Sequence, residues 1–449
     1  MEAKKFNVFV IGSGIAGQTV ATSCAEAGLK VAIADKRAFG GTCANRGCDP
    51  KKVLLAATEA LQQTAQLKGI GIEGKIEINW KKLQKFKRTF TKSVPKATEK
   101  KLLEAGITLY HQSPKFLDRN TLSVEGKMIK ADHIVIATGL EPVNLPINGS
   151  KHLKTSDDFL NLKTLPEKLV FIGGGYVGME FAHIAARAGA KVTVLDSGEL
   201  PLKGFDQDLV ERLVAYSKTL GIGFIMNAKA SSIKKLKKNY KVYYEQGGKK
   251  HHLKTAMVFN TAGRVPALKA LDLEKGQVDF NANGIEVNTL LQSKSNDLVY
   301  ACGDVADSNL PLTPLSGREG YVVAENIINN SKKRIDVPVI PSTVFTLPNL
   351  ASVGYSEEEA KKRYKNVIVK SGDANSWFNA KRWNAPVYAY KILLNERTGE
   401  IVGAHLLGPD AGETINTFAL AINHKMTEDD LQGTIFSYPS WVYDTKSMV

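Results

Sequence analysis

The chain has 449 residues, 43% of them hydrophobic and 23% charged, which is typical of globular proteins and long enough for about two to four domains. No run reaches about 18 apolar residues, which argues against a membrane-spanning helix, and four cysteines are too few for a disulfide-stapled scaffold. The net charge of +15 is compatible with an anionic substrate or cofactor but does not require one. The start, MEAKKFNVFVIGSGIAG, runs straight into a strand pattern without a secretory leader, so we expect a cytoplasmic protein.

Two segments of the chain, 7–35 and 168–196, repeat one pattern. Each has an apolar strand, a G-x-G-x-x-G turn, a small-residue helix, a second strand and a terminal Asp. In such a turn the second glycine lets the backbone approach a pyrophosphate, the third lets helix and strand pack closely, and the helix start holds the phosphates. The residues are Gly12, Gly14, Gly17 and Asp35 in the first copy and Gly173, Gly175, Gly178 and Asp196 in the second. Two copies predict two dinucleotide sites, and hence hydride transfer between a nicotinamide and a flavin.

The stretch 40–52, GGTCANRGCDPKK, contains Cys43 and Cys48. A regular helix would hold residues i and i+5 more than about 7 Å apart, which is farther than a disulfide bridges, so a bonded pair requires irregular backbone here. We expect the helix to begin afterwards, with Asp49 as its N-cap and Pro50 as its first residue. A helix start and the lysines that follow would favour a Cys48 thiolate.

The alternatives for these two cysteines are a metal site and a pair of inert thiols. Zinc needs four ligands and no second Cys/His cluster appears, so we predict no metal. The other two cysteines, Cys24 and Cys302, are expected to be small buried hydrophobic residues.

Three further segments carry recognisable turns. The runs 133–142 (HIVIATGLEP) and 260–267 (NTAGRVPA) indicate crossing points between domains, and 298–307 (LVYACGDVAD) indicates a strand that delivers Gly303 and Asp304 to a ligand. From about 341 onward, short strands followed by an amphipathic helix indicate a separate α+β domain.

The densest basic stretch is 229–254, KASSIKKLKKNYKVYYEQGGKKHHLK. It alternates like exposed antiparallel strands, with Val242 and Tyr244 on one face, and is best interpreted as a solvated surface. No nucleic-acid reader motif accompanies it, so we predict no nucleic-acid partner.

Together these motifs resemble those of the pyridine nucleotide–disulfide oxidoreductases, the family of glutathione reductase, dihydrolipoamide dehydrogenase and mercuric reductase. The resemblance covers nearly the whole chain: both glycine fingerprints, G-G-T-C-x-N-x-G-C-x-P-K-K, A-T-G, A-G-R-x-P and the G-D motif. It implies an α/β fold with two Rossmann-like domains. These are an FAD domain (1–150 and 266–340) and an NAD(P) domain (151–265). A C-terminal α+β dimerisation domain (341–449) would make a homodimer.

The resemblance also implies roles for individual residues. Cys48 would contact the flavin and Cys43 would attack a disulfide substrate. Lys51 or Lys52 would lie near the flavin and pair with Glu180, and Tyr176 would cover the nicotinamide pocket. The other cofactor-binding residues that it implies are Ser13, Ala16, Lys36, Gly41, Thr42, Thr138, Gly139, Val177, Lys203, Gly263, Arg264, Gly303, Asp304, Leu312 and Thr313.

The chain departs from the family at its C-terminus, where His-Pro-Thr-x-x-Glu is usual and YPSWVYD (438–444) stands instead. Tyr438 replaces the His, Tyr443 replaces the Glu, and Asp444 lies one position late. A neutral tyrosine is a poor base at pH 7, but it can donate a hydrogen bond to a departing thiolate. Packing at a dimer interface is the alternative for Tyr438.

Two further departures concern the substrate. Thr22 and Tyr321 stand where glutathione reductases carry substrate-binding arginines, which argues against glutathione disulfide. Arg46 and Asp49 are charged where the family is usually apolar; they set substrate preference or are ordinary exposed charges.

The preferred nicotinamide follows from the second fingerprint. Asp196 suits the free ribose of NADH and repels the 2′-phosphate of NADPH, and Ser197 stands where NADPH-using relatives have an arginine. Lys203 occupies a second phosphate-contact position, but we favour NADH.

The sequence thus predicts an FAD-dependent NAD(P)H oxidoreductase that passes electrons through Cys43 and Cys48 to a disulfide or dithiol other than glutathione. The alternative enzyme reduces a quinone, a metal ion or another acceptor directly from the flavin. A different class, a subunit of a larger complex that uses this fold for binding or redox sensing, also stays open.

Overall fold

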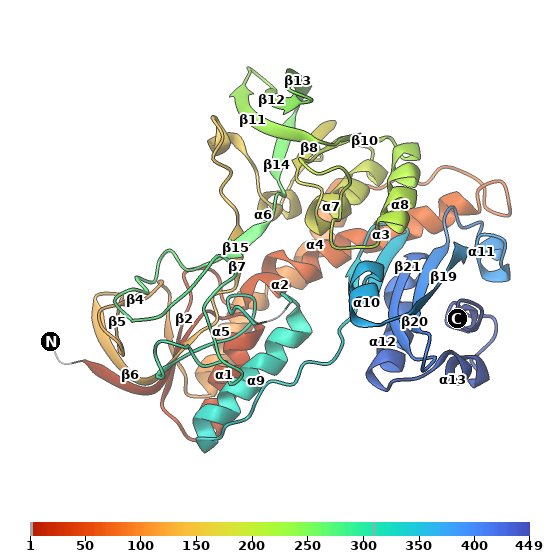
Figure 1. The fold of residues 1–449 in the computed structure, drawn as a ribbon. Coiled ribbons are helices and arrows are strands. Elements are labelled where there is room, and N and C mark those ends of the chain that lie inside the picture. Colours follow the sequence, from red (N-terminus) through yellow and green to blue (C-terminus); the bar gives the residue numbers. More distant parts are fainter. Residues whose placement is uncertain (1–2, 309) are drawn as a thin grey trace. The chain divides into compact units, whose positions relative to one another are not determined.

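The computed structural model describes residues 3–308 and 310–449 (Figure 1). They form two compact units. Unit 1 comprises Met1–Val53, Lys85–Val143 and Arg264–Val337, and unit 2 comprises Leu54–Gln84, Asn144–Gly263 and Pro338–Val449. Residues 151–263 of the predicted NAD(P) domain and all of the predicted dimerisation domain fall in unit 2, where they form separate sheets, and the three-domain division stays a prediction.

Unit 1 is built on a seven-stranded sheet of order β3-β2-β1-β6-β5-β4, with β16 paired to β6. The central strands and β16 run parallel, whereas β4 and β5 are antiparallel additions. The strands are β1 (Lys4–Ile11), β2 (Val31–Ala34), β3 (Thr108–Tyr110), β4 (Lys115–Phe116), β5 (Thr121–Val124), β6 (Lys127–Ile136) and β16 (Val299–Ala301). The helices are α1 (Ile15–Glu26), α2 (Gly41–Arg46), α5 (Val94–Glu104) and α9 (Thr313–Asn329).

The interior of unit 1 follows from this arrangement. Residues 8–11 of β1 are buried one after another, without alternation, as expected for a parallel strand that is covered on both faces. Helix α1 packs against α9, where a Cβ on Gly320 would lie 2.6 Å from the carbonyl oxygen of Ala16. The two predicted crossing segments meet, because β7 (Leu140–Pro142) pairs with β15 (Arg264–Pro266).

Unit 2 contains three sheets (Figure 1). The first, of order β10-β9-β8-β14, is parallel: β8 (Lys168–Ile172), β9 (Lys191–Leu195), β10 (Ile222–Ile225) and β14 (Met257–Asn260). The second is antiparallel: β11 (Ala228–Lys235), β12 (Tyr240–Gln246) and β13 (Lys249–Thr255). The third, of order β17-β18-β21-β20-β19, is antiparallel: β17 (Ser342–Val344), β18 (Asn349–Gly354), β19 (Val367–Asp373), β20 (Ala389–Asn395) and β21 (Ile401–Gly408).

The helices of unit 2 cover these sheets or connect their strands. They are α6 (Ser156–Leu160), α7 (Tyr176–Arg187), α8 (Gln207–Thr219), α10 (Glu357–Arg363), α11 (Phe378–Arg382), α12 (Ala411–Asn423) and α13 (Glu428–Gly433), with short 3₁₀ turns at Ser150–His152 and Tyr443–Ser447. Two more helices, α3 (Cys48–Gln66) and α4 (Trp80–Thr91), contribute residues to both units. Among the described residues, no helix is long and apolar enough to cross a membrane.

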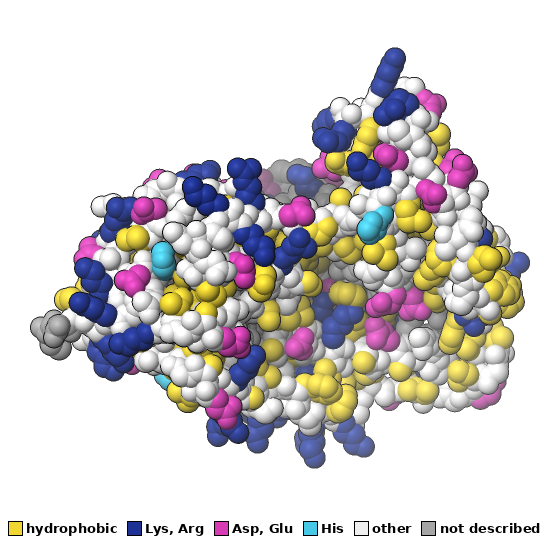
Figure 2. Space-filling model, turned by 90° about the horizontal axis from the view of Figure 1, so that it is seen from below, with side chains coloured by type: hydrophobic (Ala, Val, Ile, Leu, Met, Phe, Trp, Pro, Cys, Tyr) yellow, Lys and Arg dark blue, Asp and Glu magenta, His cyan; other side chains and the backbone are white. Residues whose placement is uncertain are grey.

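The basic stretch 229–254 forms β11 to β13, as its alternation predicted. Val242 is buried, whereas the cross-strand partners Lys241 and Lys254 occupy the opposite face of the sheet. Figure 2 shows Lys and Arg side chains spread among acidic ones over one face of the molecule rather than gathered in a single patch. The mixture of a few buried and many exposed positions along β11 to β13 agrees with a solvated surface.

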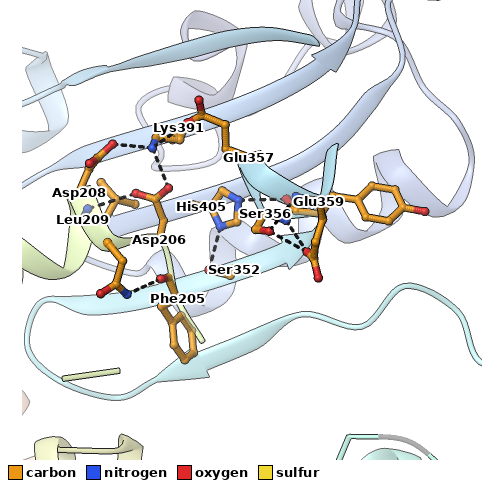
Figure 3. Close-up of polar contacts among 12 residues, drawn as sticks. Phe205, Asp206, Asp208, Leu209, Ser352, Ser356, Glu357, Glu359, Lys391 and His405 are labelled. Atoms are coloured by element: carbon orange, nitrogen blue, oxygen red, sulfur yellow. Dashed lines mark hydrogen bonds and ion pairs between the residues drawn. The ribbon is translucent and has the colours of Figure 1, made fainter. Parts of the chain in front are cut away.

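A buried lysine joins helix α8 to the third sheet of unit 2 (Figure 3). Lys391 on β20 is 6% exposed, and its Nζ lies 2.8 Å from Asp206, 2.5 Å from Asp208 and 3.2 Å from Glu357. Its register partner on β21 is His405. Burial lowers the pKa of Lys391, but the hydrogen bonds to Asp206 and Asp208 outweigh burial, so the pKa is raised and the ammonium stays charged.

Replacing this lysine should destabilise unit 2. Lys391→Met leaves Asp206 buried without its cation, and we expect the free energy of unfolding to fall by about 3–5 kcal/mol, because a buried charge without a partner is uncompensated. Urea unfolding followed by circular dichroism measures this. Lys362→Met, which breaks an exposed pair with Glu358, is the matched control and should leave the midpoint unchanged. An unchanged midpoint in Lys391→Met would contradict the assignment.

Candidate active site

The first and third glycines of each fingerprint bring a helix into contact with the strand before it. Gly12 has φ of 110°, and a Cβ on Gly17 would lie 1.9 Å from the carbonyl oxygen of Gly12. The second copy repeats this geometry: Gly173 has φ of 108°, and a Cβ on Gly178 would lie 2.2 Å from the carbonyl oxygen of Gly173. No side chain fits either contact, so α1 and α7 start directly at the carboxyl ends of β1 and β8.

The second glycine of each fingerprint has open space beside it. Among the described residues, no atom lies within 4 Å of a Cβ built on Gly175, and the nearest atom to one built on Gly14 is Gly41 Cα at 4.0 Å. Gly41 itself has φ of 71° and admits no Cβ, because one would lie 2.4 Å from Gly14 Cα. The space left beside a helix start fits the close approach of a pyrophosphate.

The terminal acids of the two fingerprints are oriented alike. The backbone N–H and hydroxyl of Ser13 donate to Asp35 Oδ2 at 2.9 and 2.6 Å. In the second copy, the backbone N–H of Gly174 donates to Asp196 Oδ2 at 2.5 Å, and that of Gly198 donates to Oδ1 at 2.7 Å. Each carboxylate is therefore fixed beside its glycine turn, where the ribose hydroxyls of a dinucleotide would reach it.

Other predicted FAD residues gather in unit 1. Thr138, which follows β6, has a buried Oγ1 without a hydrogen-bond partner among the described residues. Ser316 donates to Asp304 Oδ1 at 3.2 Å, and burial raises the pKa of Asp304, whereas Ser316 and the positive charge of Arg264 oppose the shift. A buried hydroxyl without a protein partner and a glycine turn with room beside its second glycine are features that a bound polar ligand would complete, so the residues fit FAD.

The remaining predicted cofactor residues lie as follows. Lys36 is paired with Glu141 at 3.5 Å, and Leu312 precedes α9 as its N-cap. Gly139, Gly263 and Gly303 have positive φ, and a Cβ on Gly303 would lie 3.2 Å from Cβ of Ala16. Thr42 lies in the first turn of α2, Val177 in that of α7, and Lys203 is exposed in the loop before α8.

The two cysteines of the redox motif lie on consecutive helices. Cys43 belongs to α2, α3 begins at Cys48, and Gly47 separates them with φ of −134° and ψ of −118°. The prediction that Asp49 caps the helix and Pro50 starts it is therefore wrong. Asp49 lies in the first turn, because the Gly47 backbone allows Cys48 itself to begin the helix.

The thiols are held by polar neighbours within unit 1. Cys43 Sγ donates to Asp49 Oδ1 at 3.8 Å, and Cys48 Sγ lies 4.0 Å from the hydroxyl of Thr313, the first residue of α9. The two thiols also interact with each other, and all four cysteines of the chain are free. Cys48 thus lies at the start of α3 and beside the start of α9, where both helix dipoles favour negative charge.

The pKa values of the two thiols move apart. The neighbouring Cys43 thiol, the charge of Lys51 and the hydroxyl of Thr313 outweigh burial and lower the pKa of Cys48 to about 6. The hydrogen bond to Cys48, burial and the charge of Asp49 raise the pKa of Cys43 far above its usual value, against a smaller effect of Thr313. At neutral pH the pair therefore holds its charge on Cys48 and its proton on Cys43.

The other two cysteines behave differently. Cys24 and Cys302 are fully buried in unit 1, as predicted. Burial raises the pKa of Cys24 to about 12, and burial together with Glu319 raises that of Cys302. Neither thiol shares the lowered pKa of Cys48.

Glu180 and Tyr176 lie in the first two turns of α7 in unit 2. Glu180 is buried, and its Oε1 accepts from the backbone N–H of Phe345 at 2.9 Å. Tyr176 is half-exposed at the first position of the helix. Lys51 and Lys52 belong to unit 1, and the pairing of one of them with Glu180 stays a prediction.

The C-terminal run separates the tyrosine from the acid. Tyr438 is 64% exposed and stacks on Phe378 with ring centres 6.2 Å apart. Tyr443 packs edge-on against Tyr438, with ring centres 4.9 Å apart. Asp444 is buried and accepts hydrogen bonds from Asn379 at 3.0 Å and Tyr388 at 3.2 Å. Burial raises the pKa of Asp444 against these hydrogen bonds. Asp444 is therefore held inside unit 2.

Sequence reasoning missed three residues that shape the site. Asn379 and Tyr388 hold Asp444, and nothing in the local sequence indicates a contact that spans more than fifty residues. Asp49 was predicted as a helix N-cap and noted as an unusual charge, but its hydrogen bond with Cys43 was not predicted. The signal was present, since Asp49 follows Cys48 directly.

The shifted pKa of Cys48 predicts its reactivity. In the reduced protein, alkylation of Cys48 by iodoacetamide should rise as the pH passes about 6 and level off above, because the thiolate is the nucleophile. Thr313→Val removes a hydrogen bond that lowers this pKa and should move the midpoint upward, whereas Thr313→Ser should not. Mass spectrometry across a pH series measures both. A midpoint near the ordinary thiol value of 9.0 would contradict the assignment.

Comparison with known proteins agrees with this geometry. Residues 6–320 match the pyridine nucleotide-disulphide oxidoreductase family, and residues 340–447 match its dimerisation domain. A glutathione reductase of Burkholderia cepacia is 31% identical over 442 residues, covering 98% of this chain and 97% of the relative. A dihydrolipoyl dehydrogenase of Bacillus subtilis is 30% identical, covering 96% and 95%.

A solved structure extends the likeness to three dimensions. The HOCl-induced flavoprotein disulfide reductase RclA from Escherichia coli superimposes with a TM-score of 0.88 at 26% identity, covering 99% of both chains. RclA has also been solved as a Cu(II) complex, and so has a cysteine-to-serine mutant of it. These matches confirm the predicted family, the α/β fold class and the enzyme class with its FAD and pyridine nucleotide. The chain belongs to the pyridine nucleotide-disulphide oxidoreductases.

Proposed function

We propose that the protein carries electrons from NAD(P)H through FAD and the Cys43–Cys48 pair to a disulfide or dithiol other than glutathione. The observation that carries this proposal is the position of Cys48 at the start of α3 and 4.0 Å from Thr313 at the start of α9, with Cys43 on the preceding helix α2. In keeping with this geometry, the pKa of Cys48 is lowered and that of Cys43 is raised. A stabilised thiolate at Cys48 suits contact with a flavin, and a protonated, partly exposed thiol at Cys43 suits exchange with a substrate.

The residues around the pair have distinct tasks in this scheme. Bound FAD would supply two-electron transfer between the nicotinamide and the disulfide of the pair. Lys51 and Thr313 stabilise the charge on Cys48, and the starts of α3 and α9 add their dipoles. Gly47 interrupts the helix between the thiols, so their spacing is not that of a regular helix.

The proposed exclusion of glutathione rests on two side chains. Thr22 donates its hydroxyl to the carbonyl oxygen of Gln18 within α1, so it offers no cation to a carboxylate. Tyr321 lies half-exposed on α9 with Lys333 Nζ 4.8 Å from its ring centre. An uncharged hydroxyl and a tyrosine cannot reproduce a bidentate arginine–carboxylate pair.

A metal-ion acceptor is the second candidate. RclA, which shares the fold over 99% of both chains, is known as a Cu(II) complex. Among the described residues, no group of three or more His, Cys, Asp or Glu side chains is arranged to hold a metal ion. We therefore infer that a metal ion, like a quinone, would act on this protein as an electron acceptor and not as a resident cofactor.

Two further features belong to the proposal. We propose NADH as the preferred donor, because both oxygens of Asp196 are fixed by backbone N–H groups beside the fingerprint. A homodimer is supported by the match of residues 340–447 to the dimerisation domain and by the exposed aromatic pair Phe378 and Tyr438. A cytoplasmic location and the absence of a nucleic-acid partner stay predictions.

Anaerobic reduction tests the electron path. Addition of NADH should produce long-wavelength charge-transfer absorbance from a thiolate beside the flavin. Cys48→Ser should abolish this band, because the low-pKa thiol is gone, whereas Cys43→Ser should retain it. Spectra recorded during the titration measure the band. Absence of the band in the unmodified protein would contradict the disulfide relay. Full quinone turnover by Cys43→Ser would favour the alternative in which the flavin reduces the acceptor directly.

The donor preference is tested at Asp196. The unmodified enzyme should have a higher kcat/KM with NADH than with NADPH. Asp196→Asn keeps a hydrogen-bond acceptor for Gly174 but removes the charge, and should narrow the preference by about tenfold, the effect of roughly 1.4 kcal/mol. Glu211→Gln, an equal charge change on α8, is the control. An unchanged preference in Asp196→Asn would show that another group selects the donor.

A further inference from the structure

The interchange thiol has a chemical problem that the described geometry addresses. The pKa of Cys43 is raised far above its usual value, so the sulfur carries its proton at neutral pH, yet the thiolate is the form that attacks a disulfide. The departing half of the substrate also leaves as a thiolate and is stabilised by a proton. A group that accepts the first proton and supplies the second would serve both steps.

We propose that Asp49 is this group. This inference rests on the proposed function, and it names a catalytic residue that is not part of the two dinucleotide sites. Asp49 Oδ1 accepts a hydrogen bond from Cys43 Sγ at 3.8 Å, and the side chain is exposed at the first turn of α3. The carboxylate therefore touches the reacting sulfur and is open to solvent and to substrate.

The neighbours of Cys43 support the choice of Asp49. Cys48 and Thr313 also interact with the Cys43 thiol. Cys48 is the thiolate that must stay charged for the second half of the exchange, and a hydroxyl is too weak a base to take a proton. The charge of Asp49 also raises the pKa of both thiols, so this carboxylate interacts with each of the two sulfurs.

The C-terminal run offers no competing carboxylate. Asp444 is buried, and its two oxygens accept hydrogen bonds from Asn379 and Tyr388 within unit 2. Tyr438 can donate a hydrogen bond but is a poor proton acceptor. Asp49, next to Cys43 in unit 1, therefore supplies the proton transfer that the C-terminal residues cannot.

The proposed exchange balances as follows. Cys43 Sγ forms a bond to one substrate sulfur while the substrate S–S bond breaks, and the proton of Cys43 passes through Asp49 to the departing thiolate. The Cys48 thiolate then attacks Cys43 Sγ, which forms the Cys43–Cys48 disulfide and releases the second substrate thiolate, protonated by water. The enzyme's dithiol loses two electrons and the substrate disulfide gains them.

Single-turnover exchange tests this role with two uncharged probes. Hydroxyethyl disulfide releases a basic thiolate that needs a proton, whereas dithiodipyridine releases a stabilised one that does not. With dithiothreitol-reduced holoenzyme at pH 7, Asp49→Asn should slow exchange with hydroxyethyl disulfide by about 100-fold and with dithiodipyridine by less than about tenfold. Stopped-flow absorbance and mass spectrometry measure the two rates, and bound-flavin absorbance checks that each variant is folded.

Two variants complete the design. Asp49→Glu retains a carboxylate and should restore much of the rate with hydroxyethyl disulfide, whereas Glu59→Gln, an equal charge change later on α3, should leave both rates unchanged. Equal slowing of the two probes, or no slowing with hydroxyethyl disulfide, would overturn the role of Asp49. Loss of the charge-transfer band in the unmodified protein would contradict the proposed function instead, and the dithiothreitol-driven exchange does not depend on that band.

Discussion

Both dinucleotide sites depend on the close packing of a helix against the strand before it. This packing is possible only because glycine, which has no side chain, stands at the contact. Gly17 meets the carbonyl oxygen of Gly12, and Gly178 meets that of Gly173, at distances that no Cβ allows. Each contact places a helix start at the carboxyl end of a parallel strand, where unpaired N–H groups face a ligand. Since β1, β6 and β16 run parallel, Thr138 and Gly303 follow their strands at the same edge of the sheet.

A second constraint, electrostatic rather than steric, acts on the cysteines. All four thiols have the same chemistry, and their surroundings separate them. Burial without compensation raises the pKa of Cys24 and Cys302, whereas a neighbouring thiol, a lysine and a hydroxyl lower that of Cys48. Because two nearby thiols do not both ionise easily, stabilising the Cys48 thiolate leaves the proton on Cys43.

The parts of the site that could be predicted from the sequence are those formed within about 30 residues of chain. The glycine turns and their terminal acids follow from local spacing, and so does the expectation that a helix begins close to Cys48. The predicted start of α3, at Pro50, is two residues too late, because Gly47 allows the helix to begin at Cys48. The Lys391 cluster and the burial of Asp444 depend on contacts between distant segments, for which neither periodicity nor spacing gives a signal.

The roles of four aspartates follow from the hydrogen bonds that each one accepts. Asp35 and Asp196 are fixed by backbone N–H groups beside a glycine turn, so they are oriented toward a ribose and are poorly placed to move protons. Asp444 is enclosed by an amide and a phenol inside unit 2. Asp49, among the described residues, accepts from a thiol and otherwise faces solvent. A carboxylate exchanges protons most readily where its partner is itself a proton donor in the reaction and water reaches it, and of these four only Asp49 meets both conditions.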